Sequence, residues 1–329
     1  MTKYGVGTFT ISLDFELYWG VLDVKSLNNY KNNLVGVHSA IPKMLDLFQK
    51  FNIHCTWSAV GFLFLKNFKE IIDKQPTSLP TYTNRSISPY LYSERMKSVV
   101  DNETLRLHFA PNLIKLIQQT PNQEIGTHTY SHFYSLENGQ NLTNFEDDLK
   151  KNIEIASKNG ISLKSIVFPR NQVNEKYFDV LEKYGIKSYR GPQYGWMYKS
   201  KQHTVYSSII RRGARFLDTF FKLNRSATKI EIYNTKLVNI PASRFFQPFT
   251  KRPIWLEKRK INRIKNEMTT AAKKNELYHL WWHPHNFGVN IEENIAQLEE
   301  ILLHYQELNR EGLMVSKNMS EIADEYLQQ

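Results

Sequence analysis

His128 and His132, in the run His-Thr-Tyr-Ser-His, are the residues whose spacing points most directly to chemistry. Two imidazoles four residues apart lie on one side of a helical turn, with Cβ atoms about 6 Å apart, and can share one metal ion. The same spacing arises by chance on surface helices, where the histidines have no role. A short strand and tight turn expected at residues 124–127 favour the metal interpretation, because they would aim the helical turn inward.

Asp14 and Glu16 supply a second chemical cluster at the end of a strand-like run. Their i, i+2 spacing puts both carboxylates on one face of a strand. Beside two imidazoles, one carboxylate can complete a three-ligand set with open positions, which is typical of a catalytic zinc site. The other can accept a proton from bound water. The alternative is a pair of solvated or helix-capping acids.

His283 and His285 form a third cluster near the C-terminus, where Pro284 ends a strand-like run. A histidine here can take part in acid–base chemistry. We prefer His283, because it shares one strand face with residues 277, 279 and 281. His285 is the reserve and a candidate substrate contact.

Further substrate-binding candidates are single side chains at strand ends. Trp57 is expected to pack near a turn, although a tryptophan there could also stack on a substrate. Arg190 and Arg244 could place guanidinium groups over the pocket, or be structural. Of the adjacent residues Trp281 and Trp282, one is expected in the core and one as a platform for the substrate, and Trp282 is the candidate for substrate binding.

The elements that must position these residues alternate between strands and helices. Strict alternation predicts a strand at 8–16, and apolar spacing predicts helices that include 37–51, 145–158, 254–273 and 291–309. Such an order indicates parallel strands joined by right-handed crossovers. About eight strands favour closure into a (β/α) barrel, whose chemistry collects at the C-terminal strand ends. The chemical clusters all fall at such ends.

We interpret residues 1–329 as a single barrel domain with insertions at about 74–112 and 194–235. Neither insertion keeps the strand–helix rhythm, although a helix is expected around 209–221. Insertions of this kind often build substrate pockets, so both are candidate specificity elements.

The residues from His128 to His132, with the preceding Glu-Ile-Gly-Thr, resemble the H-[ST]-x-x-H motif of the polysaccharide deacetylase family, also called the NodB homology or carbohydrate esterase family four. Asp-Phe-Glu at 14–16 stands where that family has its first acidic motif. Residues 168–172 correspond to its arginine motif, and 281–283 to its C-terminal histidine motif. The resemblance extends roughly from residue 8 to residue 322. It implies a distorted (β/α) barrel of seven to eight strands and metal-dependent removal of an acyl group from a sugar.

Site roles follow from that resemblance. Asp14 is implied as the general base, Arg170 as the arginine that orients it, and His283 as the general acid. The implied ligands of a divalent metal, most often zinc, are Glu16, His128 and His132. The chain departs from the family by having Asp-x-Glu in place of Asp-Asp, so Asp14 also stays open as a ligand. It also has Phe-Pro-Arg-Asn-Gln in place of Arg-x-Pro-x-Gly.

Composition limits the class of protein. The 329 residues carry a net charge of +11, and 41% are hydrophobic, as in ordinary globular proteins. The single cysteine, Cys55, excludes an intrachain disulfide framework, and the N-terminus resembles no signal region, so we expect a cytoplasmic protein. The basic stretch at 251–265 is either a solvated helix face or a contact for acidic lipid or a phosphate-bearing substrate. Nucleic-acid binding is disfavoured, because no zinc-finger or RNP-type pattern accompanies the charge.

We therefore expect a Zn²⁺-dependent carbohydrate N-deacetylase that acts on an N-acetylated sugar, linked to a nucleotide or lipid, in surface-glycan synthesis. One alternative is a hydrolase of the same fold that acts on a small non-sugar amide. Another is a barrel that binds carbohydrate without catalysis.

Overall fold

The strand predicted at residues 8–16 is β1 (Gly7–Phe15), and it lies inside the sheet with neighbours on both sides. All of its residues are buried. Phe9, Ile11 and Leu13 belong to the main hydrophobic core, whereas Ser12 and Asp14, on the opposite face, contact the Arg190 side chain. The alternation in the sequence thus separates a packing face from a face that carries chemistry.

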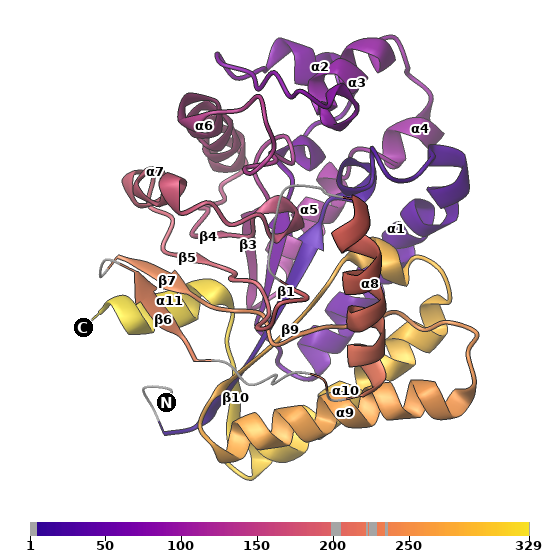
Figure 1. The fold of residues 1–329 in the computed structure, drawn as a ribbon, viewed down its shortest axis with the longest axis vertical. Coiled ribbons are helices and arrows are strands. Elements are labelled where there is room, and N and C mark those ends of the chain that lie inside the picture. The colour runs from indigo at the N-terminus through magenta and orange to yellow at the C-terminus, as the bar shows by residue number, and fades with distance from the viewer. Residues whose placement is uncertain (1–4, 199–204, 222, 224–228, 234–235, 329) are drawn as a thin grey trace.

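A curled, mostly parallel sheet surrounds β1 in the computed structural model, which describes residues 5–198, 205–221, 223, 229–233 and 236–328 (Figure 1). The strand order is β6-β7-β5-β4-β3-β2-β1-β9-β8, with β10 paired to β1, and among the described strands only β6 and β7 pair antiparallel. The strands besides β1 are β2 (Cys55–Ala59), β3 (Gln123–Thr127), β4 (Ser165–Ile166), β5 (Ser188–Tyr189), β6 (Glu231–Tyr233), β7 (Leu237–Asn239), β8 (Arg244–Phe245), β9 (Leu277–Trp282) and β10 (Met314–Ser316). The expected α/β fold with a distorted barrel is confirmed. The strands beyond the expected seven to eight are short. In the described part of the chain the strand order ends at β6 on one side and at β8 on the other.

Helices cover the outside of the sheet. In Figure 1, α9 and α10 lie side by side at the bottom of the view, and α6 and α7 lie on its left side. The helices are α1 (Leu27–Lys50), α2 (Phe68–Asp73), α3 (Pro89–Met96), α4 (Asn102–Arg106), α5 (Pro111–Gln119), α6 (Leu142–Lys158), α7 (Phe178–Lys183), α8 (Val205–Phe220), α9 (Ile254–Lys273), α10 (Ile291–Arg310) and α11 (Met319–Leu327). The helix predicted at 37–51 begins earlier, because the Ser26 hydroxyl caps α1 by accepting a hydrogen bond from the Asn29 amide.

The N-terminus of α11 packs against polar side chains from the middle of the sheet. The Met319 amide donates to the Thr56 hydroxyl at 2.8 Å, and the Ser320 amide donates to a Glu124 carboxylate oxygen at 3.0 Å. These bonds satisfy amides that a helix N-terminus otherwise leaves without partners. Burial raises the pKa of Glu124, and its hydrogen bonds oppose that rise.

The parallel strands β1, β3, β4, β5 and β9 bring their C-terminal ends to one edge of the sheet. Asp14, His128, Arg190 and His283 lie at or directly after the ends of these strands, so the fold gathers them there. The predicted insertion at 74–112 contains α3 and α4, and the one at 194–235 contains α8 and β6. Residues 199–204, 222, 224–228 and 234–235 of the second lie outside the described residues.

Candidate metal and catalytic site

The segment from His128 to His132 is a loop and not the helical turn that its spacing predicts. Thr129 and His132 have φ angles of 64° and 58°, in the left-handed region that L side chains seldom adopt. This backbone still brings the rings together, with centroids 5.1 Å apart. The prediction that the two histidines converge is confirmed, and the predicted local structure is wrong.

Asp148, on α6, holds this loop in its strained shape. Its carboxylate accepts hydrogen bonds from the Tyr130 amide at 2.7 Å, from the Ser131 amide at 3.2 Å, and from the Ser131 hydroxyl. Burial raises the pKa of Asp148 to about 7, against the opposing effect of these hydrogen bonds. No local pattern predicts this role, because Asp148 lies in a helix that is otherwise ordinary.

Glu16 meets both histidines at a single oxygen. Its Oε2 lies 3.1 Å from the Nε2 of His132 and 3.2 Å from the Nε2 of His128. The three side chains are buried, and one ligand atom from each lies within 4.8 Å of the others. Among the described residues this is the one cluster of three potential ligands, and Asp14 is not part of it.

The polar atoms of this cluster fit a divalent cation. The Nδ1 atoms of His128 and His132 are buried and make no hydrogen bond within the described part of the chain, and the Nε2 atoms of both rings approach one oxygen of Glu16 at 3.2 and 3.1 Å. Burial lowers the pKa of His132, although Glu16 opposes the change. Burial would raise the pKa of Glu16, but His283, His128 and His132 together hold it well below its usual value. Two imidazoles and a carboxylate are a three-ligand set of the kind that holds a catalytic zinc ion.

Gly20 makes room for the longer glutamate side chain. Leu17, with a φ of 47°, turns the backbone into the short 3₁₀ helix Leu17–Gly20, which directly follows Glu16. A Cβ on Gly20 would lie only 1.9 Å from the Cδ and Oε1 of Glu16. Glycine at position 20 is therefore required for the observed position of this carboxylate.

Asp14 is held by Arg190 and not by Arg170. Arg190 Nη1 and Nη2 donate to the two carboxylate oxygens of Asp14 at 2.6 and 2.7 Å. Burial would raise the pKa of Asp14, but the charge of Arg190 and its hydrogen bonds, with His128 and His283, lower it. The assignment of the orienting arginine to Arg170 is wrong, and Arg190, predicted as a substrate contact, occupies that position.

Arg170 points elsewhere because of its backbone. Its φ of 54° lies in the left-handed region, and its guanidinium pairs with Asp23 and lies 4.5 Å from the ring centroid of Tyr134. The neighbouring Asn171 takes part instead, since its side-chain oxygen accepts a hydrogen bond from Arg190 at 2.9 Å.

His279 extends the support behind Asp14. Its Nδ1 lies 3.1 Å from the Ile240 carbonyl oxygen, and its Nε2 lies 2.8 Å from the Ser12 hydroxyl. Burial and the charge of Arg190 lower the pKa of His279 to about 3, so the ring is neutral. Because a carbonyl only accepts, Nδ1 carries the proton, and the Ser12 hydroxyl donates to Nε2 while accepting from Arg190 at 2.9 Å. This chain fixes the orientation of the arginine.

The position of His283 suits a general acid better than the position of His285 does. Its Nε2 lies 3.7 Å from Asp14 Oδ2 and 3.6 Å from Glu16 Oε1, and its side chain is 24% exposed. His285 is buried beneath it, with the two rings stacked at 5.0 Å. Burial and the neighbouring His283 lower the pKa of His285 to about 3, so His285 lacks the proton that an acid must deliver.

Two predicted sugar contacts belong to the core. Trp57 and Trp282 have no exposed surface, and Trp282 stacks on Phe287 with centroids 5.4 Å apart. Trp281 is the partly exposed member of the pair. It lies under the guanidinium of Arg190 at 4.1 Å, so Trp281 replaces Trp282 as the candidate platform.

Arg244 does not reach the site. It is buried and donates to Glu267 at 2.5 and 2.7 Å and to the Asp218 carbonyl oxygen at 3.1 Å. Its predicted role as a substrate contact is therefore wrong, and its charge is used within the core.

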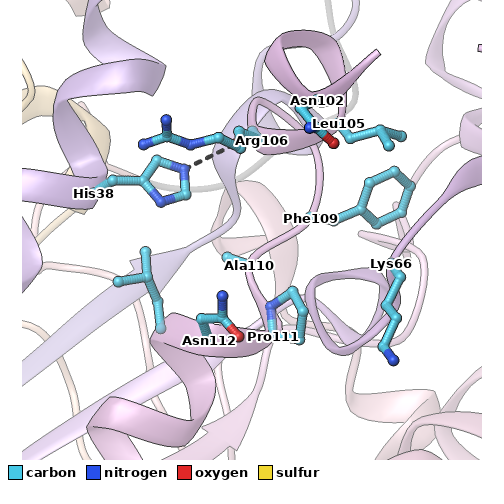
Figure 2. A pocket seen from close by; sticks show the side chains of 10 residues that line it. His38, Lys66, Asn102, Leu105, Arg106, Phe109, Ala110, Pro111 and Asn112 are labelled. Carbon is cyan, nitrogen blue, oxygen red and sulfur yellow. Dashed lines mark hydrogen bonds between the residues drawn. The ribbon is translucent and has the colours of Figure 1, made fainter. Parts of the chain in front are cut away.

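A separate pocket of about 570 Å³ lies between α1, α4 and α5 (Figure 2). His38 borders it, and its Nε2 lies 2.9 Å from the Arg106 carbonyl oxygen. The residues that line this pocket include none of the candidate ligands or catalytic residues.

Comparisons with known proteins connect this geometry to a family. The family described as polysaccharide deacetylase matches residues 35–189, a range that includes His128 and His132 but not Asp14, Glu16 or His283. A structure from Mycobacterium smegmatis, assigned to the polysaccharide deacetylases, is similar with a TM-score of 0.62 and 14% identity, over 100% of this chain and 93% of that one. PuuE allantoinase has a TM-score of 0.59 and 9% identity, over 99% and 92%. A further structure assigned to the polysaccharide deacetylases, from Pseudomonas aeruginosa PAO1, has a TM-score of 0.56 and 10% identity, over 98% and 91%. No curated protein matches the sequence.

Proposed function

The chain carries a domain of the polysaccharide deacetylases, hydrolases that act on carbon–nitrogen bonds, and from this premise we propose that it removes an acyl group, typically acetyl, from the nitrogen of an amino sugar. The observation that carries the proposal is the convergence of Glu16, His128 and His132 directly beside Asp14 and His283. Ligands, a base and an acid are the groups that amide hydrolysis needs within reach of one carbonyl.

Glu16, His128 and His132 would hold a divalent ion, for which we propose Zn²⁺. When bound, the ion would acidify a water molecule and polarise the acyl carbonyl. The buried Nε2 atoms of His128 and His132, which both lie within 3.2 Å of one Glu16 oxygen, support this assignment.

Asp14 accepts the proton of the attacking water in this proposal. Arg190 restricts its carboxylate to one orientation, and Ser12 with His279 keeps Arg190 in place. A base with a lowered pKa is a weak proton acceptor, so it depends on a water molecule that has itself been made more acidic.

His283 delivers a proton to the departing amine, which leaves poorly without one. Its ring is partly exposed and lies within 3.7 Å of both acids, so it faces the side from which a substrate arrives. The stacked His285 supports the ring from beneath.

A sugar substrate is supported by the aromatic side chains beside His283. Phe245 and Trp281 are partly exposed, with centroids 4.7 Å apart, and lie 5.8 and 5.6 Å from the His283 ring. Aromatic faces of this kind can stack on a sugar ring. We further propose a nucleotide- or lipid-linked N-acetyl sugar as the substrate and a cytoplasmic, single-domain protein that can meet an acidic membrane surface.

The test is amine release from a panel of UDP-linked and free N-acetyl sugars, before and after removal of metal by a chelator. Release that disappears on chelation, returns with Zn²⁺ and is lost in the Asp14→Asn variant supports the proposal. A zinc-loaded protein that releases no amine from any N-acetyl sugar would contradict it.

A hydrolase of small non-sugar amides is the second candidate, since PuuE allantoinase has a similar fold. Faster turnover of cyclic or linear ureides than of N-acetyl sugars would favour it. A barrel that only binds carbohydrate is disfavoured, because the geometry retains Asp14, Arg190, His283 and the three ligands together.

A further inference from the structure

Helix α8 presents an apolar stripe to solvent. Ile210, Leu217 and Phe221 fall on one side of the helical spiral and are 69%, 49% and 41% exposed. A surface helix ordinarily turns such a stripe toward the core. The stripe of α8 is therefore available for a partner.

Polar contacts at its C-terminal end attach α8 to the protein. Asp218 is buried and pairs with Arg263 Nη2 at 3.0 Å and with Arg244 Nη1 at 3.6 Å. Arg263 also donates to the carbonyl oxygens of Asp218 and Phe221. α8 is therefore held through its C-terminal end, where Phe220 is also buried, whereas Ile210 and Leu217 remain exposed.

Other exposed apolar side chains extend this surface. Ten of the seventeen large apolar residues that are exposed in the described part of the chain lie between Tyr194 and Trp255. Arg252 lies 4.7 Å from the Phe216 ring and Arg259 lies 4.7 Å from the Phe221 ring, so the start of α9 adjoins α8. We define the α8 face by its exposed apolar residues, which are Ile210, Phe216, Leu217, Phe221, Leu223, Ile254 and Trp255.

The charge around the α8 face is positive. Its exposed cations are Arg212, Arg215, Lys251, Lys258 and Arg259. The acids of the described residues between 205 and 267 are Asp218, Glu231, Glu257 and Glu267, and only Glu231 is exposed.

Only part of the basic stretch at 251–265 lies at the surface. Lys260 is buried and pairs with Glu257 at 2.6 Å, and Arg263 pairs with Asp218 and Glu267 inside the protein. These two cations are therefore not available to a partner. The cations that remain accessible surround the apolar residues of α8.

We propose that the α8 face binds the surface of an anionic lipid bilayer. An amphipathic helix with exposed apolar residues and flanking arginines is suited to the boundary between headgroups and acyl chains. Anionic headgroups complement the cations of this face. A second copy of the chain would bring the same positive charge, which disfavours dimer formation through this face.

The α8 face is connected to the candidate site. Arg244, which binds the end of α8 through Asp218, directly precedes Phe245, whose ring lies 5.8 Å from that of His283. If the proposed deacetylase function holds, this connection would bring the site close to a substrate carried by lipid. The membrane contact itself does not depend on that function.

The test is sedimentation of the full-length protein with vesicles of phosphatidylcholine alone or mixed with phosphatidylglycerol. We expect the wild type to bind the mixed vesicles, and more weakly at high salt. Each arginine removed, as in Arg212→Gln, should lower binding about fivefold. The Ile210→Glu/Leu217→Glu variant should bind at least about tenfold more weakly. Its matched control is Leu303→Glu, which changes an exposed leucine of α10 and should bind normally.

Circular dichroism and amine release from a soluble sugar show whether each variant is folded, and they separate this test from that of the proposed function. Two results would overturn the proposal. One is equal binding of the wild type to both kinds of vesicle, or no binding. The other is a concentration-dependent dimer that Leu217→Glu abolishes without any vesicle binding, which would identify the α8 face as a contact between copies of the chain.

Discussion

Replacing Gly20 by alanine should remove a metal ligand without changing the ligand itself. The added Cβ would lie 1.9 Å from the Cδ and Oε1 of Glu16 and 2.4 Å from its Oε2. Carbon atoms in contact sit about 3.5 Å apart, so the carboxylate must withdraw by roughly 1.5 Å. The colliding atoms are the end of a flexible side chain, so we expect the fold to persist with a stability change of less than about 1 kcal/mol.

The withdrawal should separate the carboxylate from both histidines. Oε2 now lies 3.1 and 3.2 Å from the two imidazole nitrogens, and a shift of this size takes it out of coordination range. We expect zinc affinity to fall at least about 100-fold, since changes that only reorient a ligand already cost 10- to 100-fold. Zinc titration and amine release at limiting and excess zinc measure the two effects.

Gly213→Ala is the matched control, because a Cβ there meets nothing within 4 Å. It should keep the zinc affinity and turnover of the wild type. A Gly20→Ala protein that binds zinc as tightly as the wild type and turns over equally fast would refute the assigned position of Glu16.

Other variants test the remaining roles. Arg190→Lys should lower kcat about 100-fold at full zinc occupancy, because a lysine cannot make the bidentate contact with Asp14. Arg170→Lys should lower kcat less than about tenfold. Equal losses in the two variants would contradict the role of Arg190 as the arginine that orients Asp14. Trp281→Ala should raise KM for an N-acetyl sugar about tenfold with little change in stability, whereas Trp282→Ala should cost about 3–5 kcal/mol in unfolding free energy, measured by denaturant titration. Burial raises the pKa of Asp148 to about 7 from an ordinary value near 4. Between these two pH values the Asp148 carboxyl group is protonated in the folded protein and ionised in the unfolded chain. The unfolding free energy of the wild type relative to Asp148→Asn should therefore fall by up to about 4 kcal/mol as the pH rises from about 4 to 7, and a constant difference would contradict that assignment.

Residue types and periodicity predicted the parts of this protein that local chemistry determines. The helix predicted at 254–273 is α9 with the same bounds, because its apolar stripe and flanking residues define it locally. The three ligands could also be predicted, since their clusters follow strands whose C-terminal ends share one edge. Their burial and approach to one another agree with that expectation.

The wrong predictions concern the directions of side chains. The sequence does not distinguish between candidates in similar positions, and the tertiary structure determines which one reaches the site. Arg170 and Arg190 both follow strands, and only the left-handed backbone at Arg170 turns it toward Asp23. Trp281 and Trp282 point to opposite faces of β9, and alternation does not say which face is covered. The loop before His132 is held by Asp148, which is sixteen residues away in the sequence and has no local signature.

The central claim is that Glu16, and not Asp14, joins His128 and His132 around a metal ion. Zinc titration of purified wild-type, Asp14→Asn and Glu16→Gln proteins, with bound metal measured at equilibrium, tests it most directly. We predict that Asp14→Asn binds one zinc per chain as tightly as the wild type and that Glu16→Gln binds at least about 100-fold more weakly. Loss of zinc from Asp14→Asn together with normal binding by Glu16→Gln would contradict the account.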